Sequence, residues 1–267
     1  MTADAPPGWD PGLYMAFAGA RTRPALDLMS RLDGDAGHIV DLGCGPGHVT
    51  ALLARRWPAV AVTGVDSSAD MLAAARRDYA AHDFPRLGWV QADIAAWRPE
   101  IPPDILFSNA CLHWLPDHPA LFARLLGMMA PGGRLAVQMP RNFDRPCHEL
   151  AREAARQAGC MAELAAQLDR AEPVAEPAEY DRWLSPLCRD LDIWETDYLH
   201  VLPGDNPVAL WGEGTWMRPL AAALGPEARR YFLDCWRGLI RRAYPPAPDG
   251  RTRFAFRRLF LIARLQG

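Results

Sequence analysis

Three glycines stand on alternate positions in the segment DLGCGPGHVT, at Gly43, Gly45 and Gly47, directly after an apolar run. Glycine at such positions permits a tight turn and lets a bound molecule approach the main chain, because no side chain occupies the space. If the turn opens a helix, the free N–H groups of the first helical residues also face that molecule. The segment therefore predicts a binding site made largely of backbone.

The spacing of these glycines argues against two common ligands of glycine-rich turns. A phosphate-binding P-loop requires Gly-Lys-Ser/Thr, and all 29 basic residues of the chain are arginines. A dinucleotide fingerprint requires G-x-G-x-x-G, but the chain has G-x-G-x-G, with His48 where the last glycine should stand. A nicotinamide dinucleotide is therefore not expected.

Acidic residues end three successive apolar runs, at Asp41, at Asp66 in VTGVD and at Asp93 in QAD. Ligands of open α/β sheets lie at the carboxyl ends of the strands, where Asp66 would accept hydrogen bonds from both ribose hydroxyls and Asp93 from an adenine amino group. A single aspartate at a strand end usually caps a helix or lies in a solvated turn. Three of them in register with the glycines favour a positively charged nucleoside.

The elements that must position these residues follow from hydrophobic periodicity. Strands are predicted over residues 38–42, 60–65, 87–91, 104–108 and 134–139, with helices beginning near Gly47, Ser68 and Asp117 and with Ser67 or Ser68 as a helix cap. The alternation predicts a parallel sheet covered by helices on both faces. Beyond Met139 the pattern predicts a helix over 145–168, a proline-broken connection over 171–179, a strand over 191–202, two helices within 207–243 separated near Gly225, and a last strand over 254–264.

Composition limits the class of protein. The chain has 267 residues, 50% hydrophobic content and a net charge of −3, which predicts one globular domain and disfavours a nucleic-acid partner. Its six scattered cysteines have no metal-ligand spacing and fit a reduced cytoplasm, so no metal is expected. No apolar run approaches the ~20 residues of a membrane span. The sequence defines no oligomeric state.

The motifs VDLGCGPG, GVDSSADML and QADI together resemble the first motifs of class I S-adenosylmethionine-dependent methyltransferases. The resemblance implies a Rossmann-like α/β fold with a seven-stranded, mostly parallel sheet and a helical insertion, about residues 203–250, between the last two strands. It implies a helical lid over residues 1–33, a cofactor-binding core over 34–140 and a sheet completed by 141–267. The implied cofactor is S-adenosylmethionine, and the cofactor-binding residues are Tyr14, Arg23, Asp41, Gly43, Gly45, Gly47, Asp66, Ser67, Met71, Asp93, Ile94, Asn109 and Ala110.

The residues around the fourth strand bear on the methyl acceptor. An amine or hydroxyl acceptor usually requires a base, for which His113 in SNACLHW is the candidate. A carboxylate is already ionised and needs cationic side chains and exclusion of water instead. Because methyltransferases of the class that the motifs resemble carry such His-Trp pairs without a shared acceptor chemistry, we expect His113 to shape the pocket without moving a proton. Trp114 would form a wall that faces the sulfonium.

Longer segments, at residues 9–29, 135–155, 195–204, 214–224 and 256–264, resemble the branch of this class that methylates a carboxylate of a small tricarboxylic acid. Arginine pairs with carboxylates through two parallel hydrogen bonds, so the substrate pocket should gather arginines. The implied substrate-binding residues are Arg141, Tyr198, His200, Trp216, Arg218 and Arg258, with Arg23 as a further candidate. Arg257 stands where that branch often has proline, and DRPCHE is a variant of its segment.

Each of these assignments has a structural alternative. Arg258 interrupts an apolar strand and would equally serve in a buried ion pair, and Arg218 would suit an exposed helix face. Arg23 beside Pro24 would flank a helix start. The alternation of Tyr198 and His200 also suits a half-exposed strand. The aromatic stripe of the proposed lid, Trp9, Tyr14 and Phe17, also suits core packing.

Two other functions stay open from the sequence. In the first, the chain is a methyltransferase whose acceptor is another small di- or tricarboxylate, or a malonyl thioester on a carrier protein. In the second, the chain is a cofactor-binding regulatory module without turnover.

Overall fold

The computed structural model describes residues 18–169 and 173–267, so the predicted aromatic stripe of Trp9, Tyr14 and Phe17 lies outside the described residues. The chain divides into two compact units, and each is described by itself. The sheet unit includes Gly19–Pro140, Pro173–Thr196 and Arg258–Gly267, and the helical unit includes Arg141–Glu172 and Asp197–Arg257. None of the described helices is long and apolar enough to cross a bilayer.

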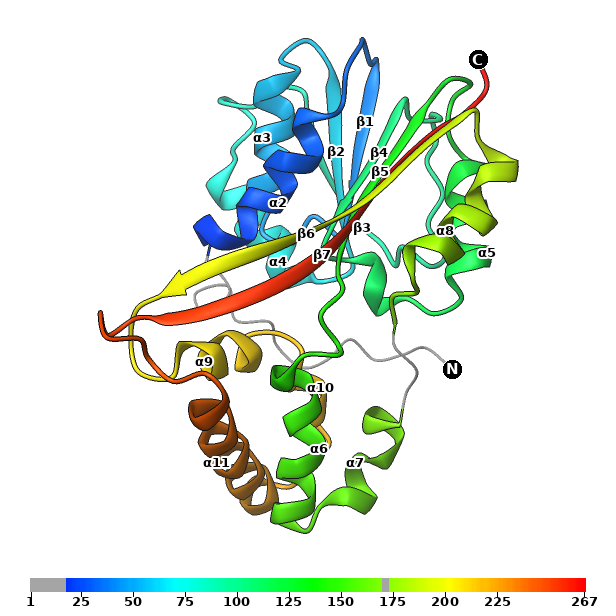
Figure 1. Ribbon diagram of the computed structural model, residues 1–267. Helices are drawn as coiled ribbons and strands as arrows, with labels where there is room; N and C mark the ends of the chain where they lie inside the picture. Colours follow the sequence, from blue (N-terminus) through cyan, green and yellow to red (C-terminus); the bar gives the residue numbers. More distant parts are fainter. Residues whose placement is uncertain (1–17, 170–172) are drawn as a thin grey trace. The chain divides into compact units, whose positions relative to one another are not determined.

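The seven strands form one sheet with the order β3-β2-β1-β4-β5-β7-β6 (Figure 1). Strands β1 to β5 are parallel and β7 runs antiparallel to β5, which confirms the predicted mostly parallel sheet of Rossmann-like type. The strands are β1 (His38–Leu42), β2 (Ala61–Asp66), β3 (Leu87–Gln91), β4 (Ile105–Asn109), β5 (Arg134–Pro140), β6 (Asp190–Leu202) and β7 (Thr252–Arg264).

The central strands are buried along nearly their whole length. In β4 and β5 every residue except the last is buried, as expected where helices cover both faces of a parallel sheet. The helices of the sheet unit are α2 (Ala18–Ser30), α3 (His48–Arg56), α4 (Ala69–Asp78), α5 (His118–Leu126) and α8 (Pro177–Leu184), with short 3-10 turns η1 (Leu112–Trp114) and η2 (Ser185–Leu187).

The start of α4 confirms one predicted cap. The Ser68 hydroxyl accepts a hydrogen bond from Met71 N at 3.3 Å, and Asp70 lies in the first turn of the helix. Two other boundaries were predicted wrongly. Pro24 lies inside α2 rather than at a helix start, so Arg23 does not flank one, and α8 begins at Pro177, within the segment expected to be a connection.

The helical unit contains α6 (Pro146–Ala158), α7 (Met161–Leu168), α9 (Pro207–Glu213), α10 (Met217–Ala222) and α11 (Pro226–Ala243), so the insertion between β6 and β7 is helical as predicted. The prediction of one helix over 145–168 was wrong because Gly159, with φ of +70°, ends α6. The prediction of two helices within 207–243 was also wrong. A further break follows Glu213, where the Thr215 hydroxyl donates to the carbonyl of Trp211 at 2.8 Å.

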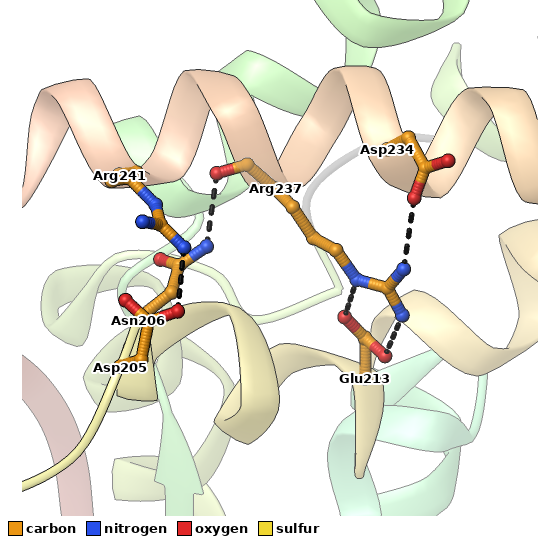
Figure 2. Close-up of polar contacts among 6 residues, drawn as sticks. All are labelled: Asp205, Asn206, Glu213, Asp234, Arg237 and Arg241. Atoms are coloured by element: carbon orange, nitrogen blue, oxygen red, sulfur yellow. Dashed lines mark hydrogen bonds and ion pairs between the residues drawn. The ribbon is translucent and has the colours of Figure 1, made fainter.

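Charged side chains fix α9 against α11 (Figure 2). Arg237 on α11 donates from Nε and Nη2 to the two oxygens of Glu213, each at 2.7 Å. Near the other end of α9, Asn206 Nδ2 donates to the Arg237 carbonyl at 2.9 Å, and Arg241 donates to Asp205 at 2.7 Å. The bidentate geometry restrains orientation as well as distance. Both ends of α9 are thus held on one helix.

Candidate functional site

The glycine turn between β1 and α3 uses its three glycines for different purposes. All have positive φ, at +72°, +54° and +84° for Gly43, Gly45 and Gly47. A Cβ at Gly43 would lie 2.1 Å from Cys111 Sγ, and one at Gly47 would lie 2.4 Å from the Trp89 ring. A Cβ at Gly45 would meet no atom within 4 Å. Gly43 and Gly47 are therefore required by packing within the protein, whereas Gly45 faces open space.

Asp66, at the end of β2, connects this turn to the next helix. Its Oδ2 accepts from Gly45 N at 2.8 Å and its Oδ1 accepts from Ser68 N at 2.9 Å. A carboxylate has about four acceptor positions, so each oxygen retains capacity for a ligand hydroxyl. Asp66 thus orders the backbone at the glycine turn and presents acceptors there.

Asp41, at the end of β1, is only 2% exposed. Thr50 on α3 donates from Oγ1 to Asp41 Oδ2 at 2.7 Å. Burial raises the pKa of Asp41 to about 7, with the Thr50 hydrogen bond opposing the shift and the charge of Asp66 adding to it. Asp41 therefore gains or loses its charge near neutral pH.

Replacing Asp41 by asparagine is expected to stabilise the protein at pH 8 more than at pH 5. A carboxyl whose pKa is raised on folding contributes stability at low pH, and this stability is lost as pH rises toward about 7. The variant avoids that loss, on the order of 2–4 kcal/mol. Urea unfolding at both pH values measures the effect, with the exposed Asp70→Asn as control. Equal stability changes at pH 5 and pH 8 would contradict the assignment.

The segment after β3 combines a buried side chain with an exposed carboxylate. Ile94 is buried and Asp93 is exposed, with Asp93 Oδ1 accepting from Ala95 N at 2.9 Å. Arg124 on α5 fixes this segment by donating to the Ile94 carbonyl at 2.7 Å. On α4, Met71 is 3% exposed, while Ser67, just before the helix, is exposed.

The end of β4 carries a backbone conformation that is unusual for a residue with a side chain. Ala110 has a φ of +54°, and its N–H donates to the Gln138 carbonyl on β5 at 2.9 Å. Asn109 Oδ1 is buried and has no hydrogen-bond partner among the residues that the structure describes. The rings of His113 and Trp114 follow in η1, with centroids 4.8 Å apart. Trp114 is 37% exposed, so one face of η1 is apolar and accessible.

Arg258 on β7 belongs to the same sheet unit and is only 4% exposed. Its Nη1 donates to Gln138 Oε1 at 3.3 Å. In the register of β5 and β7, Arg258 pairs with Pro140, two residues beyond Gln138. Gln138 was not predicted from the sequence, where its only signal is a polar residue within the apolar run LAVQMP.

The other predicted substrate residues belong to the helical unit. Arg141 is buried and its N–H donates to the Arg257 carbonyl at 3.0 Å, whereas Arg218, on α10, is partly exposed. Tyr198 and His200 are buried on the covered face of β6, and the His200 ring stacks on Trp211 with centroids 5.1 Å apart. Alternate residues of this strand are thus covered by aromatic rings.

Trp216 stacks on His148, with ring centroids 4.0 Å apart. Burial lowers the pKa of His148 to about 3, so this ring is neutral at physiological pH. Arg257, the departure from the family pattern, lies 3.8 Å from Asp144 and 3.7 Å from Asp197. It therefore takes part in ion pairs between two segments of this unit.

Two predicted residues lie toward the start of the chain. Arg23 is exposed on α2, and Tyr14 lies outside the described residues. Within 18–169 and 173–267, no group of three or more His, Cys, Asp or Glu side chains is arranged to hold a metal ion.

Comparison with known proteins identifies relatives over nearly the whole chain. Residues 39–133 match the family model described as a methyltransferase domain. The trans-aconitate 2-methyltransferase of Methylobacterium nodulans is 46% identical over 257 residues, covering 96% of this chain and 98% of the relative. The enzyme of the same name from Azoarcus sp. strain BH72 is 44% identical over 263 residues, covering 96% and 99%.

Solved structures share the fold at low sequence identity. Phosphoethanolamine N-methyltransferase 2 of Haemonchus contortus, in complex with S-adenosyl-L-methionine, matches with a TM-score of 0.55 and 18% identity, covering 96% of this chain and 56% of the other. The YcgJ protein of Bacillus subtilis matches with a TM-score of 0.55 and 14% identity, covering 91% and 97%. At this level of identity the likeness establishes the class I methyltransferase architecture.

Proposed function

We propose that this chain, which belongs to the trans-aconitate 2-methyltransferase family, transfers the methyl group of S-adenosylmethionine to a carboxylate of trans-aconitate. Side chains of its sheet unit hold both the donor and the reacting carboxylate. The products are the monomethyl ester and S-adenosylhomocysteine. The family assignment favours this function over methylation of another small di- or tricarboxylate, methylation of a malonyl thioester on a carrier protein, or cofactor binding without turnover.

The carboxyl ends of β1 to β4 suit the donor. Gly45 leaves open space at the turn, Asp66 offers carboxylate acceptors for ribose hydroxyls, and the unpartnered Oδ1 of Asn109 is a further acceptor. We assign the remaining contacts to Asp41, Gly43, Gly47, Ser67, Met71, Asp93, Ile94 and Ala110, with Tyr14 and Arg23 as candidates from the N-terminal segment. The cofactor supplies an electrophilic methyl group, and these residues orient it.

The acceptor side requires positioning rather than proton transfer. A carboxylate is ionised at neutral pH, so its oxygen attacks without a base and must only be held in line with the methyl group. Arg258 is buried on β7, which is separated from the donor-binding strand β4 by β5 alone. A guanidinium there would bind one carboxylate through two hydrogen bonds. His113 and Trp114 would shape the space between. Arg141, Tyr198, His200, Trp216 and Arg218 stay candidates for substrate binding on the family resemblance alone.

The observation that carries this assignment is the buried Arg258 on β7, the strand next to β5, in a chain 46% identical to a trans-aconitate 2-methyltransferase. Incubation with methyl-labelled S-adenosylmethionine and a panel of carboxylic acids tests it. We expect label in a base-labile ester with trans-aconitate and much less with cis-aconitate, isocitrate or malonate. Label transfer to none of the acids would refute the enzyme activity.

The glycine turn gives a matched pair of substitutions. Gly45→Ala is expected to weaken S-adenosylmethionine binding at least tenfold. It should lower the free energy of unfolding by only about 1 kcal/mol, because the new Cβ meets no protein atom and the only cost is the positive φ of residue 45. Gly47→Ala is expected to cost about 3 kcal/mol, because its Cβ overlaps the Trp89 ring. Calorimetry and urea unfolding measure the two effects. The interpretation fails if both variants lose the same stability.

A further inference from the structure

Gln138 lies on β5, between β4, which ends at the proposed donor site, and β7, which carries Arg258. In the register it is opposite Asn109 on β4 and opposite Phe260 on β7. Directly opposed residues of neighbouring strands project to the same face of a sheet, and so do residues two apart on one strand. Asn109, Gln138 and Arg258 therefore project to one face, on three adjacent strands.

The side-chain amide of Gln138 is fully buried, and its two ends have different surroundings. Its oxygen accepts from Arg258 Nη1 at 3.3 Å. Its nitrogen, Nε2, has no hydrogen-bond partner within the described part of the chain. A buried donor without a partner is unfavourable in the free protein, so a ligand that accepts from it recovers that loss on binding.

The neutrality of this amide matters as much as its position. A glutamate at 138 would also accept from Arg258, but it would add a negative charge beside the guanidinium and would have no N–H to donate. A glutamine fixes the guanidinium without adding charge and directs a second donor to the same face. An arginine and an amide side by side are suited to one anionic group with several lone pairs.

Resting on the proposed function, we propose that Gln138 is a substrate-binding residue that determines specificity for a carboxylate. Its oxygen orients Arg258, and its Nε2 donates to an oxygen of the carboxylate that receives the methyl group. The backbone carbonyl of the same residue accepts from Ala110 N at 2.9 Å, so the acceptor site is fixed directly to the end of β4.

Two substitutions of similar size separate this role from a merely structural one. Gln138→Met removes both hydrogen-bonding ends, and Gln138→Glu keeps an acceptor for Arg258 while replacing the donor with a negative charge. If Gln138 only held Arg258, the glutamate variant would keep its affinity for trans-aconitate. If Gln138 binds the carboxylate, the glutamate variant is the worse of the two.

The test measures initial rates against trans-aconitate concentration for both variants, with S-adenosylmethionine affinity and melting temperature measured in parallel. We expect the KM for trans-aconitate to rise about 10-fold for Gln138→Met and at least 100-fold for Gln138→Glu, with cofactor affinity changed less than threefold. The exposed Gln157→Glu, on α6, adds the same charge and is the control.

A Gln138→Glu variant with an unchanged or lower KM would overturn the proposal, and so would a fall in cofactor affinity equal to the rise in KM. Failure of the wild-type protein to methylate trans-aconitate would instead reject the proposed function. The two failures are therefore separate results of one experiment.

Discussion

Replacing Arg258 by lysine is expected to raise the KM for trans-aconitate about 100-fold while S-adenosylmethionine binding changes little. Lysine keeps the positive charge but loses the planar pair of donors that matches a carboxylate. Loss of one charge-assisted hydrogen bond in a buried site costs about 2–3 kcal/mol, which corresponds to a factor of 30 to 150 in affinity. Steady-state rates with varied trans-aconitate measure the effect.

The control for Arg258 lies on the same strand. Arg253 pairs with Asp249 at 2.7 Å and is 40% exposed in its side chain, so Arg253→Ala should leave both substrates unaffected. Arg258→Ala should be at least as impaired as the lysine variant. If Arg258→Lys binds trans-aconitate normally but melts at a lower temperature, the guanidinium has a structural role and the assignment fails.

Replacing Asp66 by alanine is expected to weaken S-adenosylmethionine binding by at least 100-fold. The substitution removes the acceptors of the Gly45 and Ser68 N–H groups, which order the glycine turn and the entry to α4, together with the proposed acceptor for the ribose. Two lost hydrogen bonds from the ribose hydroxyls to a charged acceptor, at about 1.5 kcal/mol each, account for a factor of this size. Isothermal titration calorimetry measures the affinity directly.

Asp70→Ala on the same helix is the matched control, because Asp70 is exposed in the first turn of α4 and its carboxylate is worth only a few tenths of a kcal/mol there. The melting temperature of Asp66→Ala should fall as well, since two of the lost bonds are internal. To separate the two effects, S-adenosylhomocysteine is titrated alongside adenosine. Equal affinity of wild type and variant for adenosine would show that Asp66 does not bind the nucleoside.

The sheet and the cofactor motifs were predictable because their causes are local. Buried parallel strands are continuous apolar runs, and Ser68 is a good cap at a helix entry whatever the rest of the chain does. A polar partner for the buried Arg258 was predictable for the opposite reason, since one charge within an apolar strand pattern requires a partner or a ligand.

The remaining features depend on packing between distant segments, which periodicity does not report. The three glycines look alike in sequence, yet Gly43 and Gly47 are constrained by Cys111 and Trp89, far along the chain. Gln138 acquires its importance only when β7 pairs with β5 and brings Arg258 to it. The break between α9 and α10 falls at Gly214, the C-cap of α9, and the Thr215 hydroxyl donates back to the Trp211 carbonyl there.

The thiol of Cys44, inside the glycine turn, is 6% exposed, and burial together with the nearby carboxylates raises its pKa far above the usual value. The thiolate is the nucleophile that attacks thiol reagents, so Cys44 is expected to react only when the turn opens to water. The rate at which Cys44 is modified therefore reports how often the turn opens. Adding S-adenosylmethionine should slow the modification of Cys44. Following the modified residue by mass spectrometry would then report ligand exchange without a label.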